Sequence, residues 1–234
     1  MLGTIVNFAA IIVGSLIGLL LRGGLKENIR DILNQGTSLA VMFVGISGCV
    51  TNMQAEGANP VLFIVALALG GIIGEWVGIE AALARLGDWI QGKLSKGGGM
   101  GNFSKGFVSA SLVVCVGTMA VMGAIESGVR GNHSILFAKS LLDAIITVVM
   151  ASTLGIGVLF SGFSVLVYQG ALTLLAVWVS PYLTGDMLRE IGILGGIMIT
   201  AIGTNMLGIT KVRVGNLLPA LLVPVAYYLI TGLF

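Results

Sequence analysis

The sequence contains few charged residues. Only 9% of its 234 residues are Asp, Glu, Lys or Arg, whereas an average soluble domain has about 25%. A chain with so few charges cannot cover a globular surface with solvated groups, and 56% of its residues are hydrophobic. The net charge of +2 is also too small to favour a nucleic-acid partner. We therefore expect a protein whose main partner is the lipid bilayer.

Cysteine and histidine are scarce as well. Cys49 and Cys115 both lie in apolar segments, which indicates small packing residues rather than a disulfide or a metal site. His133 is the only histidine, so no Cys/His set predicts zinc, and we expect no cofactor. The hydrolase Gly-x-Ser-x-Gly motif, the His-Glu-x-x-His motif and the P-loop are absent, so we expect no enzyme.

The sequence contains one short pattern that is typical of a catalytic serine. The segment 45–48 matches the Gly-x-Ser-Gly of rhomboid-type intramembrane proteases, whose serine needs a histidine base on another helix. Ser47 and His133 are both expected near the outer side of the membrane. A serine protease that uses Ser47 and His133 is therefore a remote alternative.

The sequence does contain long apolar runs, of the roughly 20 residues that cross a bilayer as a helix. They predict an all-α polytopic membrane protein with about eight spans. The predicted spans are 3–21, 36–53, 60–79, 107–126, 135–157, 163–181, 191–209 and 214–233. The first has no basic segment before it, so we expect it to span rather than to be a cleaved signal peptide. Seven spans are the alternative, because only residues 159–162 separate the fifth from the sixth.

Lys and Arg predict the orientation. The first, third and seventh connections hold most of the basic residues: Arg22, Lys26, Arg30, Arg85, Lys93, Lys96, Lys105, Lys211 and Arg213. The even connections hold only Arg130 and Arg189. Because basic residues concentrate in cytoplasmic loops, we expect the odd connections inside the cell and both termini outside.

The long connection over 80–106 divides into two pieces. Residues 80–96 predict an amphipathic helix, either at the cytoplasmic interface or as an extension of the third span. Gly97–Asn102 predicts a flexible linker. A smaller amphipathic piece, Lys26–Asn34, is expected at the first cytoplasmic turn, and Pro219 and Pro224 predict a kink in the last span.

Two segments resemble each other. Ile29–Ile32 leads into a glycine-rich span from Gly36, and Leu188–Ile191 leads into another from Gly195. Because these spans are expected to run in opposite directions, they suggest an inverted repeat of spans 1–3 and 6–8. The units would be 1–80 and 160–234, with linking helices in 107–157, inside one transmembrane domain. Inverted repeats are common in carriers, whose site lies near the midplane.

The span over 135–157 carries two charges inside an apolar run. Lys139 and Asp143 are four residues apart, so they share one helix face with Ser140 and Thr147. Charged groups within a span are costly and usually functional. We expect either an ion or solute site with Asp143 as its carboxylate, or a structural Lys–Asp pair. One carboxylate and one lysine suit a metal cation and an organic anion equally well as the bound species.

Other polar residues in the spans are further candidates for the site. They are Asn7, Asn52, Thr204, Asn205 and Glu75. Amides and hydroxyls beside glycine can supply oxygen ligands where a helix breaks, and they can equally serve as caps or interhelical hydrogen bonds.

The chain also resembles a known family. The opening Met1–Asn7, the following Gly14–Gly18 and the late Gly203–Gly208 are similar to those of the YqgA/YdfK family of bacterial inner-membrane proteins. The resemblance covers essentially the whole chain. It implies a multi-pass protein of the bacterial plasma membrane and a candidate transport role, and it carries over no functional residues.

We therefore expect a transporter of a small solute or ion, with its site near the midplane around 135–157. Eight short, glycine-rich helices are few for a carrier acting alone, so a homo-oligomer is expected. A passive ion channel, and a membrane scaffold or sensor that binds a cytoplasmic partner through 80–96, are the alternatives.

Overall fold

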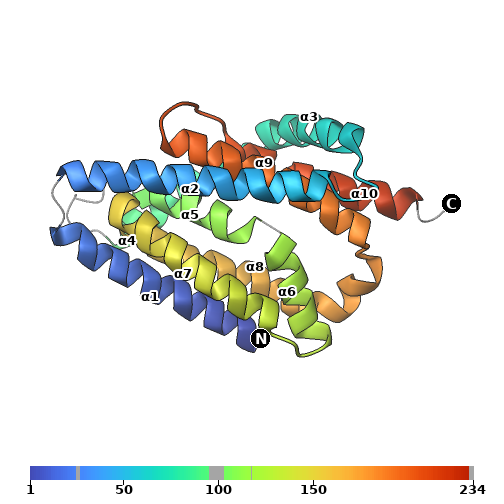
Figure 1. Ribbon diagram of the computed structural model, residues 1–234, viewed down its shortest axis with the longest axis horizontal. Coiled ribbons are helices and arrows are strands. Elements are labelled where there is room, and N and C mark those ends of the chain that lie inside the picture. Colours follow the sequence, from blue (N-terminus) through green and yellow to red (C-terminus); the bar gives the residue numbers. More distant parts are fainter. Residues whose placement is uncertain (25–26, 95–102, 117, 232–234) are drawn as a thin grey trace.

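The computed structural model describes residues 1–24, 27–94, 103–116 and 118–231, and all regular structure in these ranges is helical. The α-helices are α1 (Leu2–Gly24), α2 (Glu27–Met53), α3 (Pro60–Val77), α4 (Ile79–Leu94), α5 (Phe103–Cys115), α6 (Thr118–Val129), α7 (Ser134–Leu154), α8 (Gly157–Val179), α9 (Gly185–Met206) and α10 (Leu222–Thr231). Two 3-10 helices, η1 (Ser180–Tyr182) and η2 (Val214–Leu221), complete the set. They form an elongated bundle (Figure 1).

Most of the helices are built to cross a membrane. Within the described ranges, α1, α2, α3, α7, α8, α9 and the combined η2–α10 segment are each long and apolar enough to span. Helices α5 and α6 pass the same test only together, with a bend of 60° between them. The protein is therefore an all-α polytopic membrane protein, as the apolar runs predict.

Helices α5 and α6 together follow α8 along its length. Gly157, at the start of α8, lies against Phe103, and Gly128, near the end of α6, lies against Thr173. Between these points the hydroxyls of Ser111 and Ser164 are 2.9 Å apart. The residue numbers rise together, so the α5–α6 pair runs parallel to α8. The span predicted over 107–126 is thus made of two half-helices.

Glycines set the spacing of the main helix pairs. A Cβ on Gly14 would lie 2.5 Å from the Ala144 carbonyl oxygen, and one on Gly18 would lie 2.1 Å from that of Val148. Only glycine permits this approach, which places α1 and α7 side by side in parallel (Figure 1).

The same close contact joins α2 and α9. A Cβ on Gly45 would lie 2.7 Å from the Gly196 carbonyl oxygen, and one on Gly203 would lie 2.6 Å from the Met42 nitrogen. As residue numbers rise along α2 they fall along α9, so the two helices are antiparallel. They are the counterparts in the proposed inverted repeat, whose units at 1–80 and 160–234 stay a prediction.

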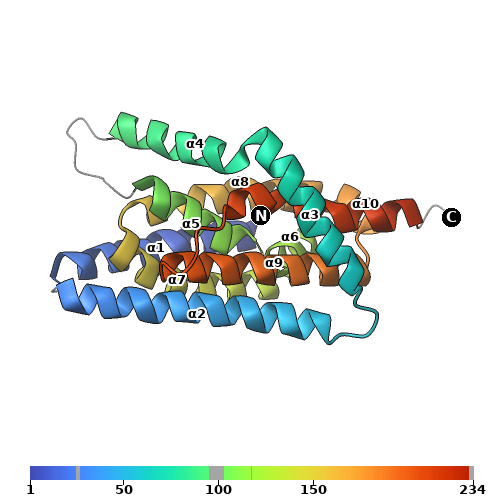
Figure 2. The same cartoon turned by 90° about the horizontal axis from the view of Figure 1, so that it is seen from above.

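Helices α3 and α4 lie to one side of this bundle. Asn59 caps α3 by accepting hydrogen bonds from the Val61 and Leu62 amides, and Gly78, at φ 69°, ends it. Helix α4 follows at an angle to α3, as Figure 2 shows. Its range, Ile79–Leu94, includes most of the residues of the helix predicted over 80–96. Residues 95 and 96 and the predicted Gly97–Asn102 linker lie outside the described residues.

The last span is interrupted by proline. Pro219 lies within the 3-10 helix η2, and the chain becomes α-helical at Leu222. A change of helix type thus stands where Pro219 and Pro224 predict a kink, and the kink itself stays a prediction.

Two predicted boundaries are wrong. The fifth and sixth spans are separated at Gly155 and Ile156, not at 159–162, because Gly155 takes the left-handed φ of 86° and ends α7. Ser161 lies within α8, and its hydroxyl donates to the Val158 carbonyl. The piece predicted over Lys26–Asn34 is not separate either: from Glu27 onward it is the first part of α2.

Candidate functional site

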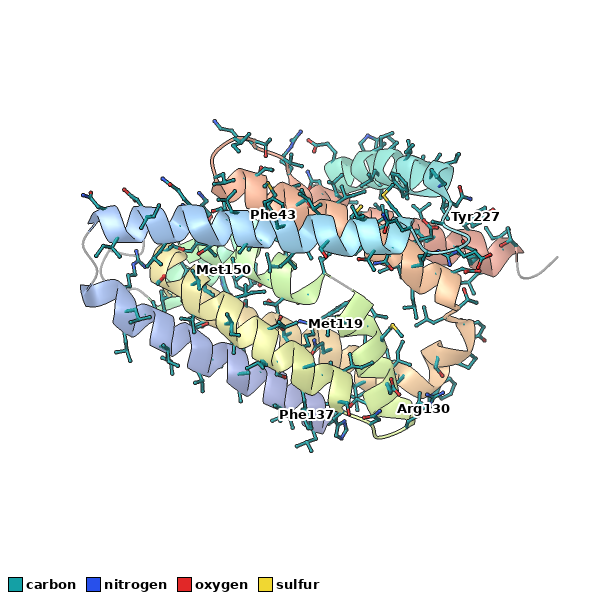
Figure 3. The ribbon with its side chains drawn as sticks, in the orientation of Figure 1. Phe43, Met119, Arg130, Phe137, Met150 and Tyr227 are labelled. Carbon is teal, nitrogen blue, oxygen red and sulfur yellow. The ribbon has the colours of Figure 1, made fainter. Side chains whose placement is uncertain are left out.

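The bundle holds a cavity of about 280 Å³ that opens at its surface, where the lining residues Val44, Leu142 and Ile145 are 49–56% exposed. Its walls come from α2, α7 and α9 and from the two ends that face each other at the α5–α6 break. Most of the lining is apolar, and Met119, which Figure 3 labels, lies there at the start of α6. The polar side chains that line it are those of Thr37, Asn52, Lys139 and Asp143. We call this space the central cavity.

Lys139 and Asp143 form an ion pair on the wall of the central cavity. They are one turn apart on α7, and their side chains are only 8% and 7% exposed. The Lys139 ammonium donates to Asp143 Oδ2. Such burial is costly for either charge alone, so each needs the other to remain ionised in this place.

The break in the fourth span supplies a third partner. Helix α5 ends at Cys115, so the Val114 carbonyl has lost the amide donor that a continuous helix would place four residues later. Lys139 Nζ donates to this carbonyl oxygen at 2.7 Å. The negative end of the α5 half-helix thus faces a cation, which is the favourable arrangement.

A pair of amides continues the network away from the cavity. Asn7 Nδ2, on α1, donates to Asp143 Oδ2 at 3.0 Å and to Gln169 Oε1, on α8, at 3.2 Å. Both amide side chains are completely buried. Asn7 Oδ1 and Gln169 Nε2 have no hydrogen-bond partner. The network therefore keeps bonding capacity that the protein itself does not use.

The hydroxyls of Ser140 and Thr147, which are predicted beside the Lys139–Asp143 pair, donate hydrogen bonds to backbone carbonyls of α7 itself. Ser140 donates to the Leu136 carbonyl at 2.6 Å, and Thr147 donates to the Asp143 carbonyl at 2.8 Å. Both side chains are buried close to the ion pair, and neither is bonded to its charged atoms.

Asn52 lines the central cavity from α2. Its amide donates to the Gly48 carbonyl at 2.7 Å and packs against Gly192 of α9. Of the nine predicted site residues, the structure joins three in one network, Asn7, Lys139 and Asp143, and places Asn52 on the same cavity.

Thr204 and Asn205 lie elsewhere, at the end of α9. Asn205 accepts from the Val212 amide at 2.8 Å and donates to the Val212 carbonyl at 2.7 Å, which closes the loop before η2. The hydroxyls of Thr204 and Thr210 are 2.7 Å apart in the same loop.

Glu75 is also remote from the cavity. It pairs with Arg213 and accepts from the Asn216 amide at 2.7 Å. Asn216 in turn accepts from the Glu80 amide at 2.7 Å, and the Glu80 carboxylate accepts from the Gly215 amide at 2.6 Å. These five residues, which we call the α3–η2 cluster, fasten the end of α3 and the start of α4 to η2.

The predicted site lacks several buried polar residues, among them Gln169, Glu190 and the cavity-lining Thr37. Gln169 stands alone in an apolar run, and a lone amide in mid-span is the signal that points to it. Glu190, on α9, is completely buried; its Oε1 accepts from the Asn59 amide at 2.9 Å, while its Oε2 has no partner.

The remote protease hypothesis has no support from contacts. His133 Nδ1 and Ser127 Oγ are 2.8 Å apart, so the imidazole pairs with the hydroxyl of the preceding helix, while Ser47 lies on α2. Within the described ranges, no three His, Cys, Asp or Glu side chains are grouped as a metal site.

Comparison with known proteins gives the family. Residues 2–229 match the family described as "Protein of unknown function (DUF554)", and the chain belongs to this family. It is 35% identical to the "Uncharacterized membrane protein YdfK" of Bacillus subtilis (strain 168) over 224 residues, covering 96% of this chain and 94% of the relative. It is 30% identical to the "Uncharacterized protein YqgA" of Escherichia coli (strain K12), covering 94% and 93% respectively. The family resemblance seen in the sequence is thereby confirmed. No solved structure matches the chain.

Proposed function

We propose that the protein is a transporter of a small solute or ion and that the central cavity is its binding site. The observation that carries this proposal is the buried Lys139–Asp143 pair, which lines the cavity where a membrane span is interrupted. Ionisable groups within a span mark substrate or ion pathways.

The helix break strengthens the proposal. Irregular backbone at membrane depth persists where it is buried in protein or lines a cavity. In carriers, half-helix ends of this kind contribute carbonyl oxygens to ions and amides to anionic groups. Here the α5 end offers the Val114 carbonyl, and the first turn of α6 lines the cavity through Met119 and Ala120.

Flux into proteoliposomes tests the proposal. Purified protein is assayed with a panel of inorganic ions, organic acids and amino acids, as wild type and as Asp143→Asn. We expect at least one species to enter with the wild type and its flux to fall at least tenfold in the variant. Asp186→Asn is the matched control, because the Asp186 side chain is 56% exposed at the start of α9. The flux of this variant should equal that of the wild type.

A second variant separates a lost site from a lost fold. Lys139→Met with Asp143→Leu replaces the ion pair by apolar groups, which buried pairs often tolerate without loss of stability. If this double variant folds and still transports at the wild-type rate, the pair is structural and the proposed site is wrong. No flux for any species in the wild type would contradict transport itself.

The proposal extends to location and assembly. We place the protein in the bacterial inner membrane, with both termini outside, as a homo-oligomer. The basic residues of the first, third and seventh connections support this orientation. Reporter domains fused to each terminus test it, because an activity that requires the cytoplasm should be absent from both fusions.

A further inference from the structure

We propose that Asp143, Asn7, Gln169 and the Val114 carbonyl form a binding site for a monovalent inorganic cation, and that the Lys139 ammonium holds this position when the cation is absent. This inference rests on the proposed function of the central cavity, and it names the chemical class of the ion. The site lies behind the cavity wall, between α1, α5, α7 and α8.

The atoms around Lys139 Nζ are those that suit a hard cation. Its acceptors are Asp143 Oδ2 and the Val114 carbonyl oxygen, a carboxylate and a free backbone carbonyl. Alkali and other hard cations prefer such oxygen ligands. An ammonium in this position thus occupies a place that already has the oxygens and the negative charge that a cation needs.

The adjacent amides can complete the shell. Asn7 Nδ2 now lies 3.0 Å from Asp143 Oδ2 and 3.2 Å from Gln169 Oε1, while Asn7 Oδ1 has no partner. Turning the Asn7 amide by half a rotation would bring its oxygen beside these two oxygens. Three oxygens together repel one another in an apolar interior unless a cation lies among them. In the turned amide Oδ1 has the cation as its partner, and Nδ2 takes the unbonded place that Oδ1 now holds.

The charge of the site selects a monovalent ion. Asp143 is the one carboxylate in the network, and within the described ranges no group of three acidic, His or Cys side chains exists to hold a divalent or transition metal. One cation neutralises this carboxylate, and a second would be an uncompensated charge in the membrane interior. The bound ion and a charged Lys139 therefore exclude each other: Lys139 releases its proton to water when the ion binds, and the neutral amine turns into the cavity that its side chain lines.

Thermal unfolding in different salts tests the inference without any transport assay. Lys139→Gln, wild type and the double variant Lys139→Gln with Asp143→Asn are compared in LiCl, NaCl, KCl and N-methyl-D-glucamine chloride at equal ionic strength. In Lys139→Gln, at least one alkali cation should raise Tm by about 5 °C when its concentration is ~100-fold above Kd. The shift should be smaller in wild type and absent in the double variant. The matched control is Lys105→Gln, at an exposed position in the first turn of α5, which should behave as wild type.

The outcomes decide between the alternatives. If Tm of Lys139→Gln is the same in all four salts, or if Asp143→Asn leaves its cation response unchanged, the cation site is wrong. Adding Asn7→Leu to Lys139→Gln should reduce the response at least tenfold in apparent affinity, and an unchanged affinity would also contradict the site.

A second variant keeps the test decisive if Lys139→Gln does not fold. Asn7→Asp adds a second carboxylate beside Asp143 and retains Lys139, so its Tm should depend on alkali cations more strongly than that of the wild type. Equal dependence would overturn the inference. Cation-dependent stability without flux would leave the binding site standing and contradict transport, whereas Asp143-dependent flux without cation-dependent stability would do the reverse.

Discussion

Two places in this protein join distant helices through a carboxylate, a basic side chain and an amide. In the central network these are Asp143, Lys139 and Asn7. In the α3–η2 cluster they are Glu75, Arg213 and Asn216. The residue chemistry is almost the same, and the surroundings differ.

The difference lies in how completely the polar atoms are used. Asn216 donates to Glu75 and accepts from the Glu80 amide, so both ends of its amide are bonded, and the Glu75–Arg213 pair is exposed by 48% and 64%. Asn7 is bonded at one end only, and the pair beside it lines a cavity. Full satisfaction is typical of a structural fastening, whereas unused buried groups bonded to an ion pair that lines a cavity favour a place where something else binds. The following predictions test this distinction.

Gly74→Val should have a large effect, since it disrupts the α3–η2 cluster as a packing unit. A Cβ on Gly74 would lie 1.9 Å from the Asn216 carbonyl oxygen, so the helices must separate. We expect a loss of about 3 kcal/mol or more in the free energy of unfolding in bicelles. Gly36→Ala, with open space around it, is the control and should be neutral or slightly stabilising. A Gly74→Val protein as stable as the wild type would contradict the described packing.

Asp143→Asn should destabilise by about 3–5 kcal/mol, because it leaves the Lys139 charge buried without its partner. The same unfolding measurement on Lys139→Met with Asp143→Leu should recover most of this loss. If the double variant is no more stable than the single one, the loss does not come from an uncompensated charge.

Glu75→Gln should cost less than about 1 kcal/mol, because its ion pair with Arg213 is solvent-exposed and glutamine keeps an oxygen for the Asn216 amide. Flux in proteoliposomes should match the wild type. A loss of flux equal to that of Asp143→Asn would remove the distinction between the two regions.

Gly48→Leu should change stability least and still affect function. Gly48 lines the central cavity, and no atom lies within 4 Å of the position that a Cβ would take there, so the new side chain enters empty space. We expect an unfolding free energy within about 1 kcal/mol of the wild type, with flux reduced at least tenfold. Wild-type flux in a folded Gly48→Leu protein would place the transport path outside this cavity.

The sequence predicts the spans well because their signal is local. Length and hydropathy locate every span, although α2 begins nine residues before the predicted start and the fourth span is two helices. The i, i+4 spacing of Lys139 and Asp143 predicts their pairing. The misplaced end of α7 has a local cause too: Ser161 and Gly162 resemble a break, although the turn is made by the backbone of Gly155.

The rest of the site depends on contacts between helices, which the spacing of residues along the sequence does not predict. Val114 carries no polar side chain, and it joins the network only because α5 ends beside α7. Gln169 joins because α8 lies against α1. Conversely, Glu75, Thr204 and Asn205 lie in apolar stretches of the sequence, as Asp143 does. In the structure they lie near helix ends, where their hydrogen bonds fasten neighbouring segments.

The Lys139–Asp143 network also has a consequence for how the chain enters the membrane during synthesis. Helix α7 carries two charges, each costing about 2.5–3.5 kcal/mol near the centre of a lone inserting helix. Two of the groups that compensate them, Asn7 of α1 and the Val114 carbonyl of α5, precede α7 in the chain. They leave the ribosome before α7 and are available to pair with it. Gln169 follows on α8 and completes the network only afterwards. The order of residues along the chain is thus the order in which the charged helix finds its partners.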